Sequence, residues 1–155
     1  MTTLASPATK HDSVTAYACS DHRRLEAQLR DACAHVTAAD FQGALIAHAA
    51  FQAGLENHIR IEEQVLFPLF ETLVGIMGGP TTTLRQEHRE IVRTTALMGE
   101  ALVRGDAKAF EAGVTFLQGT LDPHHSKEEH VLYPTTDRAL TDQERKSVVE
   151  RLMRE

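Results

Sequence analysis

HIRIEEQVLFP, at residues 58–68, recurs 66 positions later as HHSKEEHVLYP, at residues 124–134. Both stretches begin with a histidine that is followed four residues later by a glutamate, and both end at a proline. At the same offset His22 corresponds to His88, and 36 residues separate each of these histidines from the one that opens the next stretch. The chain therefore has the pattern of two copies of a helix pair, each with one lone His and one His-x-x-x-Glu.

Apolar periodicity and stop signals predict five helices. The four long ones are expected at residues 13–36, 40–74, 82–103 and 106–133, with Pro134 closing or kinking the fourth. A capping-box pattern at residues 141–144 predicts a short final helix at 142–154. Residues 1–11 are expected to form a flexible arm. No segment alternates like a half-buried strand, so we predict one all-α domain, a four-helix bundle over residues 12–155 whose duplicated halves are 12–75 and 82–135.

Each long helix carries an apolar stripe at steps of three and four residues, and side chains of metal-ligand type interrupt every stripe. In the second and fourth helices the stripe continues beyond these interruptions, so Leu69 and Val131 are expected in the core. A bundle would bring the interrupting side chains into one interior: His22, His58, Glu62, His88, His124 and Glu128.

Two carboxylates and four imidazoles on one core need a common explanation, because a buried carboxylate without a partner is strongly destabilising. A pair of bound metal ions supplies it. A His and a Glu four residues apart lie about 6 Å apart on one helix face and can reach the same ion. Two carboxylates from opposite helices can each bridge two ions. This donor set suits iron, with manganese or zinc as alternatives, while a hydrogen-bonded structural role is the competing interpretation for any single histidine.

The fourth helix offers two registers for its ligands. His125 and Glu129 have the same spacing as His124 and Glu128. The repeat and the apolar stripe both select His124 and Glu128. We therefore expect His125 and Glu129 to lie around the centre or at the surface.

Glu26 is a candidate extra ligand, because it follows His22 by four residues and shares its helix face. Val92 occupies the corresponding position of the second half, so Glu26 would make the centre asymmetric. The alternative for Glu26 is a solvated carboxylate on the helix surface.

Composition and charge exclude several function classes. The net charge of −6 and the pI near 5.8 offer no basic face to nucleic acid or to anionic lipid. No window has the roughly 18 apolar residues of a membrane span, and no apolar signal segment opens the chain, which favours the cytoplasm. Cys19 and Cys33 lie in one predicted helix, too far apart for a disulfide, and are expected to be reduced and buried.

These motifs resemble the hemerythrin-like HHE cation-binding domain family. The resemblance covers about residues 12–135 and rests on residues 21–24, 58–68, 87–88 and 124–134. It implies an up-down four-helix bundle with an oxo- or hydroxo-bridged di-iron centre. Members of the family bind dioxygen, respond to iron or oxygen, handle nitric oxide and peroxide, or serve iron-sulfur repair.

The chain departs from the oxygen-carrying hemerythrins on the third helix. Those proteins have a His-x-x-x-His pair there, whereas this chain has only His88, with Leu84 and Val92 four residues to either side. The missing histidine leaves a coordination position for water, peroxide or another ligand. The chain also lacks the separate cysteine-bearing N-terminal segment of the iron-sulfur repair proteins, which it resembles in its bundle motifs.

The sequence therefore predicts a non-haem di-iron protein that binds or turns over hydrogen peroxide, dioxygen or nitric oxide. Such a protein would act in oxidative or nitrosative stress or in iron homeostasis, as a peroxidase- or catalase-like or nitric oxide-handling oxidoreductase. The alternative is a non-catalytic module that senses iron, oxygen or nitric oxide and acts through a protein partner, for which the final helix is the natural surface. A third interpretation, a structural metal bundle, fits an open coordination position less well.

Overall fold

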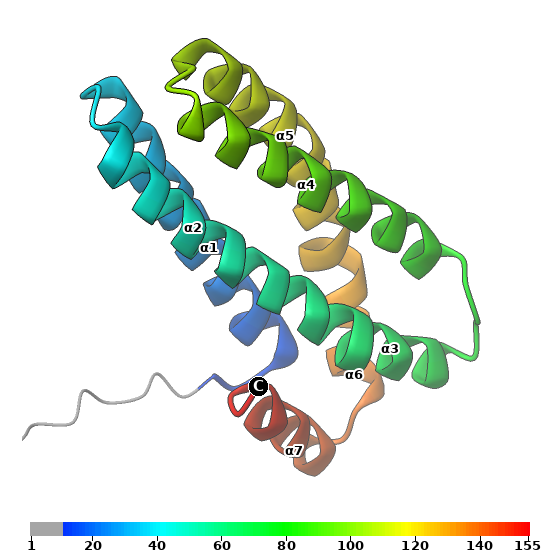
Figure 1. Cartoon of the computed structure of the whole chain (residues 1–155). Coiled ribbons are helices and arrows are strands. Elements are labelled where there is room, and N and C mark those ends of the chain that lie inside the picture. The colour runs from blue at the N-terminus through cyan, green and yellow to red at the C-terminus, as the bar shows by residue number, and fades with distance from the viewer. Residues whose placement is uncertain (1–10) are drawn as a thin grey trace, which may run out of the picture.

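The computed structural model describes residues 11–155 and confirms the predicted all-α bundle (Figure 1). Within these residues no strand occurs. The helical elements are α1 (Val14–Thr37), α2 (Phe41–Ile61), the π-helical turn η1 (Glu62–Leu66), α3 (Phe67–Val74), α4 (Pro80–Val103), α5 (Ala107–Lys127), the π-helical turn η2 (Glu128–Leu132), α6 (Tyr133–Ala139) and α7 (Asp142–Leu152). Apart from residue 11, the predicted flexible arm lies outside the described residues, and the proposed domain limits stay predictions.

The two hairpin turns show why the repeat folds alike. The side chains of Asp40 and Asp106 each accept a hydrogen bond from the backbone N–H three residues on and so cap α2 and α5. The residue before each aspartate adopts the left-handed conformation, with φ 56° at Ala39 and 65° at Gly105. Glycine suits this conformation and alanine takes it at some cost, so the sequence difference leaves the turn unchanged.

The helices pack as two antiparallel hairpins. In Figure 1, α1 and α2 run side by side, as do α4 and α5, and α2 contacts α4 between the hairpins. Helices α3 and α6 continue α2 and α5, whereas α7 crosses the end of the bundle against α1. There Val149 and Leu152 are buried, and the Tyr17 hydroxyl donates a hydrogen bond to the Leu152 carbonyl oxygen at 3.0 Å. The up-down four-helix bundle with a short extra C-terminal helix is therefore confirmed.

The two π-helical turns correct the predicted core stripe. The amide of Phe67 bonds to the carbonyl of Glu62, and the amide of Tyr133 to that of Glu128, so each turn spans five residues instead of four. The extra residue rotates the following helix, and Leu69 in α3 is only half-buried. Val131 lies inside the second turn and is 55% exposed, although Val65 at the same place in the first turn is buried. The expectation that both lie in the core was wrong.

Pro134 does not close the fourth helix, which continues through it as α6 to Ala139. A proline in a helix ordinarily clashes with the carbonyl four residues earlier and lacks the N–H that would bond to it. The wider π-helical turn directly before Pro134 relieves that crowding, and Pro68 follows the first π-helical turn in the same way.

Apolar side chains form two core clusters with a polar layer between them. One cluster fills the end of the bundle near the hairpin turns and includes Leu25, Leu55 and Leu121. The other lies toward α3, α6 and α7 and includes Leu66 and Leu132. The predicted ligands stand between these clusters along each helix, so apolar side chains flank the layer on both sides.

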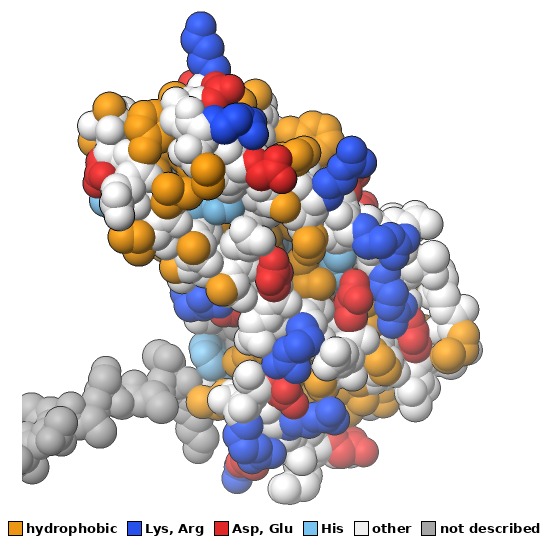
Figure 2. Space-filling view, in the orientation of Figure 1, with side chains coloured by type: hydrophobic (Ala, Val, Ile, Leu, Met, Phe, Trp, Pro, Cys, Tyr) orange, Lys and Arg blue, Asp and Glu red, His pale blue; other side chains and the backbone are white. Residues whose placement is uncertain are grey.

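The described residues show no membrane-spanning helix, a face of mixed charge (Figure 2) and two free cysteines. No helix of the described residues is long and apolar enough to span a membrane. On the face in Figure 2, acidic and basic side chains are mixed, and no single-sign patch forms. Cys19 and Cys33 are free and half-buried, so they are not joined by a disulfide, and their burial is less complete than predicted.

Candidate metal centre

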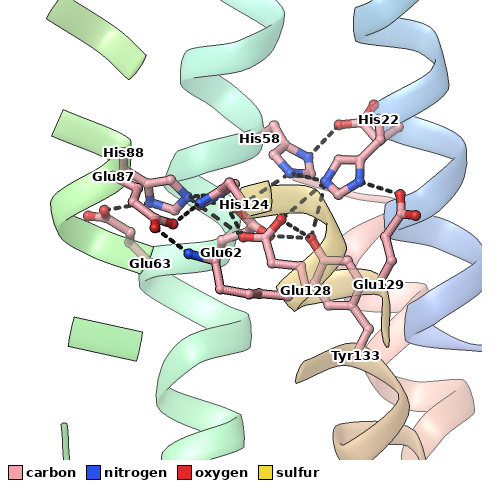
Figure 3. Close-up of polar contacts among 12 residues, drawn as sticks. His22, His58, Glu62, Glu63, Glu87, His88, His124, Glu128, Glu129 and Tyr133 are labelled. Carbon is pink, nitrogen blue, oxygen red and sulfur yellow. Dashed lines mark hydrogen bonds and ion pairs between the residues drawn. The ribbon is translucent and has the colours of Figure 1, made fainter. Parts of the chain in front are cut away.

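The structure brings the six predicted residues together in the polar layer (Figure 3). Each of the six is at most 5% exposed. Their donor atoms form two groups, and within each group these atoms lie within 4.8 Å of one another. Both groups contain Glu62 and Glu128. The first group is completed by His22 and His58, and the second by His88 and His124.

Distances within the two groups repeat closely. The Nε2 atoms of His22 and His58 are 3.1 Å apart, and the same distance separates the Nε2 atoms of His88 and His124. Glu62 Oε2 lies 3.4 Å from His58 Nε2 and 3.1 Å from His88 Nε2. Glu128 faces the other two histidines, with Oε1 2.8 Å from His124 Nε2 and Oε2 3.4 Å from His22 Nε2. Each glutamate therefore lies between one histidine of each group.

A carboxylate on the outer side orients each of the four imidazoles. In every case the ring Nδ1 lies 2.8 to 2.9 Å from a carboxylate oxygen: Glu129 for His22, Glu63 for His88, Asp21 for His58 and Glu87 for His124. Since a carboxylate only accepts, each Nδ1 carries the proton and donates it. A neutral imidazole in this tautomer points the lone pair of Nε2 into the centre.

The interior of the centre is therefore a collection of acceptors that needs cations. Two pairs of Nε2 lone pairs face each other, and Glu62 Oε2 and Glu128 Oε1 are buried without a hydrogen-bond partner. Such contacts repel unless a proton or a metal ion stands between the atoms. This donor set fits two cations that share both carboxylates.

The pKa shifts of these side chains also indicate that the centre is stabilised by positive charge. Burial acts to lower the pKa of His58, yet Glu62 and Asp21 raise it to about 10. Burial acts to raise the pKa of Glu62, but His58 and His88 hold it well below its ordinary value. Burial likewise acts to lower the pKa of His124, and Glu128 raises it. A proton held on these imidazoles satisfies the carboxylates when no metal is bound.

His125, the residue after His124 in α5, lies beside the centre. His125 belongs to neither donor group, and its ring stacks on that of His22 with centroids 3.7 Å apart. Burial and the nearby His22 lower its pKa to about 2, so it is neutral. His125 and Glu129 thus lie around the centre and both contact His22. His125 stacks on its ring, and Glu129 accepts a hydrogen bond from its Nδ1.

Glu26 lies apart from both donor groups. Its side chain is 55% exposed and its Oε2 is 4.0 Å from Arg30 Nη1. The structure therefore places Glu26 on the surface of α1, in line with the solvated alternative.

Sequence reasoning missed two features of the site. It gave no role to the outer carboxylates of Asp21, Glu63 and Glu87, although the repeat pairs Asp21 with Glu87 and Glu63 with Glu129. It also missed Tyr133, whose hydroxyl donates a hydrogen bond to Glu62 inside the polar layer. The signal for Tyr133 was the hydroxyl that it adds where the first of the two repeated stretches has Phe67.

Comparison with known families gives one match. The model of the hemerythrin HHE cation-binding domain matches residues 20–136, and a second match covers residues 79–155. The overlap of the two ranges agrees with a repeat in which the second half of the chain resembles the first. No curated protein and no solved structure matches the chain.

Proposed function

The chain belongs to the hemerythrin HHE cation-binding domain family, and from this premise we propose that it is a non-haem di-iron protein that reacts with a small oxidant, namely hydrogen peroxide, dioxygen or nitric oxide. The observation that carries the proposal is the pair of buried donor groups that share Glu62 and Glu128. Sharing two carboxylates is the arrangement expected for two ions held close together.

We assign the six residues as metal ligands: His22, His58, Glu62, His88, His124 and Glu128. Four neutral imidazoles and two carboxylates suit iron better than the harder magnesium or calcium, and manganese or zinc remain weaker candidates. When bound, an iron pair supplies Lewis acidity and electrons to a small oxidant. The chain itself supplies the orientation of the imidazoles through their outer carboxylates and a buried polar layer between two apolar clusters.

Helix α4 supports a reactive metal centre over one in which every coordination position is filled by the protein. Neither Leu84 nor Val92 offers a donor atom one helical turn from His88. The second group therefore contains two histidines and the two shared glutamates. Iron commonly takes more ligands than these four, so a position is available to an exogenous molecule.

A cavity of about 210 Å³ lies beside the centre. It lies between α1, α2 and α5 and is lined by apolar and polar side chains, with His125 among them. None of the six ligands lines this cavity, and His125, whose ring stacks on His22, stands between the cavity and the first group.

Metal content and reaction with oxidants test the proposal. Anaerobic loading of the metal-free protein with Fe(II) should give about two iron ions per chain, and the loaded protein should be oxidised by at least one of the three oxidants. The reaction is followed by the change in the optical spectrum. One iron ion or fewer per chain, or a diferrous protein that is inert to all three, would contradict the proposal. A single oxidation without repeated consumption when reductant is supplied would favour the sensing alternative.

Removal of an outer carboxylate should weaken metal binding without abolishing it. Glu129→Ala takes away the acceptor that orients His22, and losses of about 10- to 100-fold in affinity are typical for such partners. Glu129→Gln, whose amide oxygen can still accept from Nδ1, should recover part of the loss. Competition with a chelator measures both affinities.

Glu26→Ala is the matched control for Glu129→Ala. It removes a glutamate one helical turn from His22 in α1. Because Glu26 is exposed and lies outside both donor groups, this variant should bind metal like the parent protein. A loss of affinity in Glu26→Ala that equals or exceeds that of Glu129→Ala would restore Glu26 as a ligand.

A further inference from the structure

Tyr133 is fully buried in the polar layer and reaches both carboxylates of the centre (Figure 3). Its hydroxyl donates to Glu62 Oε1, lies 3.2 Å from Glu128 Oε2, and lies 3.3 Å from His22 Nε2. All three partners belong to the first donor group. The phenol oxygen therefore stands among the donor atoms themselves, inside the ring of outer carboxylates.

The contacts with Glu128 and His22 have the separations of ligands to a common ion. Donor atoms about 2.1 Å from one ion lie about 3.0 to 3.4 Å from their neighbours in octahedral or tetrahedral geometry. Within the first group, His22 Nε2 lies 3.1 Å from His58 Nε2 and 3.4 Å from Glu128 Oε2. Tyr133 Oη, at 3.2 and 3.3 Å from two of these donors, falls in the same range.

The second group has no counterpart to this oxygen. The repeat places Phe67 where Tyr133 stands, and the Phe67 ring stacks on His88 with centroids 5.5 Å apart. Phenylalanine offers no donor atom, whereas the four histidines, the two glutamates and the outer carboxylates are all duplicated. The phenol is thus the feature that makes two otherwise matching positions different.

We propose that Tyr133 is a seventh metal ligand, bound through its phenol oxygen to the ion held by His22 and His58. This inference rests on the proposed function, since it requires iron in the centre. As the iron–oxygen bond forms, the phenol O–H bond breaks and the proton leaves to bulk water, and no electron is transferred. Tyrosine oxygen is an established donor to ferric iron in proteins.

The consequence is a division of roles between the two ions. The ion beside Tyr133 has five protein ligands: His22, His58, Glu62, Glu128 and Tyr133. The ion beside Phe67 has four and keeps the available position. The oxidant therefore binds on the His88 and His124 side, and the phenolate stabilises the ferric state of the other ion.

The optical spectrum of the oxidised protein tests the ligand directly. Phenolate bound to Fe(III) absorbs visible light by charge transfer, and excitation in that band enhances tyrosine ring vibrations in the resonance Raman spectrum. The iron-loaded, oxidised wild-type protein should show both signals. The chain has only two tyrosines, which makes the assignment clean. Tyr133→Phe should lose both signals while still binding about two iron ions.

Tyr17→Phe is the control, because the Tyr17 hydroxyl bonds to the Leu152 carbonyl where α7 packs on α1. This variant should keep both signals at full intensity. Wild-type protein with about two iron ions and no phenolate signal would overturn the inference and leave the proposed function standing. Failure of the wild-type chain to bind iron would contradict the proposed function instead. If Tyr133→Phe does not fold, the spectra of wild type and Tyr17→Phe decide the question alone.

Discussion

Glu62→Gln should abolish the tight binding of both metal ions. Glu62 belongs to both donor groups, with its Oε2 3.4 Å from His58 Nε2 and 3.1 Å from His88 Nε2. Glutamine preserves the volume of the side chain but removes the negative charge that two cations would share. We expect affinity to fall by more than about 100-fold, beyond the loss typical of an outer carboxylate. Metal analysis after gel filtration and chelator competition give the stoichiometry and the affinity.

The neighbouring residue provides the matched control for this substitution. Glu63→Gln changes the same charge one position along the chain, where the carboxylate is 36% exposed and accepts from His88 Nδ1. It should retain about two ions with weakened affinity. If Glu62→Gln instead lost one ion and kept the other tightly bound, Glu62 would serve a single ion and the centre would not be bridged through it.

The same assay decides which histidine of α5, His124 or His125, is a metal ligand. His124→Ala should lose metal, because His124 Nε2 lies 2.8 Å from Glu128 Oε1 within the second donor group. His125→Ala removes a ring that only stacks on His22, and it should keep both ions. The opposite result would place the ligands one residue further along the chain.

The six candidate ligands could be selected from the sequence because burial and chemistry conflict at each of them. A histidine or glutamate on an apolar stripe must be satisfied, and the 66-residue repeat supplied the same pattern twice. The structure brings together all six residues that this argument selected. The surface position of Glu26 was less certain from the sequence, since residues four apart share a face whether or not the face is buried there.

The π-helical turns were not predictable from apolar periodicity. Each begins at a glutamate of the centre, Glu62 or Glu128, and replaces one four-residue hydrogen bond by a five-residue one. Nothing in side-chain polarity marks this change of the backbone, and the stripe drawn at constant period therefore placed Leu69, which follows the first turn, in the core. A proline follows each turn and is its local signal in the sequence. At Pro134 a possible helix end was predicted instead.

The outer carboxylates escaped prediction for a different reason. Glu63, Glu87 and Glu129 are partly exposed, and glutamate on a helix surface is common without any role. Their function depends on which imidazole of another helix lies opposite, and only the packing of the helices determines that. Tyr133 is similar, because its hydroxyl reaches Glu62 from beyond the π-helical turn.

The metal-free protein should lose stability as the pH rises from about neutral to alkaline values. The folded-state pKa of His58 is raised to about 10 from an ordinary value of 6.5, because Glu62 and Asp21 outweigh its burial. A group with a raised folded-state pKa contributes its full stabilisation below the unfolded-state pKa and loses it as the pH rises through the folded-state value. The melting temperature of the apoprotein should therefore decline between pH 6.5 and pH 10. Scanning fluorimetry of chelator-treated protein across this range measures the slope.

Glu62 sets the opposite limit. Its pKa is held well below the ordinary 4.5, mainly by His58 working against burial, so its stabilisation is present above that value and is lost as the pH falls through the folded-state pKa. The apoprotein should thus be most stable between the two transitions. His58→Gln, which cannot hold a proton at this site, should flatten the alkaline slope. A slope equal to that of the parent protein would show that other groups cause it.

Metal binding should remove most of this alkaline dependence, because the ions replace the protons that otherwise stand between the imidazoles and the carboxylates. A ligand at about 1,000 times its dissociation constant stabilises the folded state by about 4 kcal/mol. In a domain of this size that corresponds to a rise of roughly 8 to 16 °C in melting temperature for each ion. The difference between metal-loaded and metal-free protein should widen as the pH rises from 6.5 toward 10. A constant difference across that range would mean that metal and proton do not compete for the same Nε2 atoms, and it would contradict the tautomers that the outer carboxylates impose.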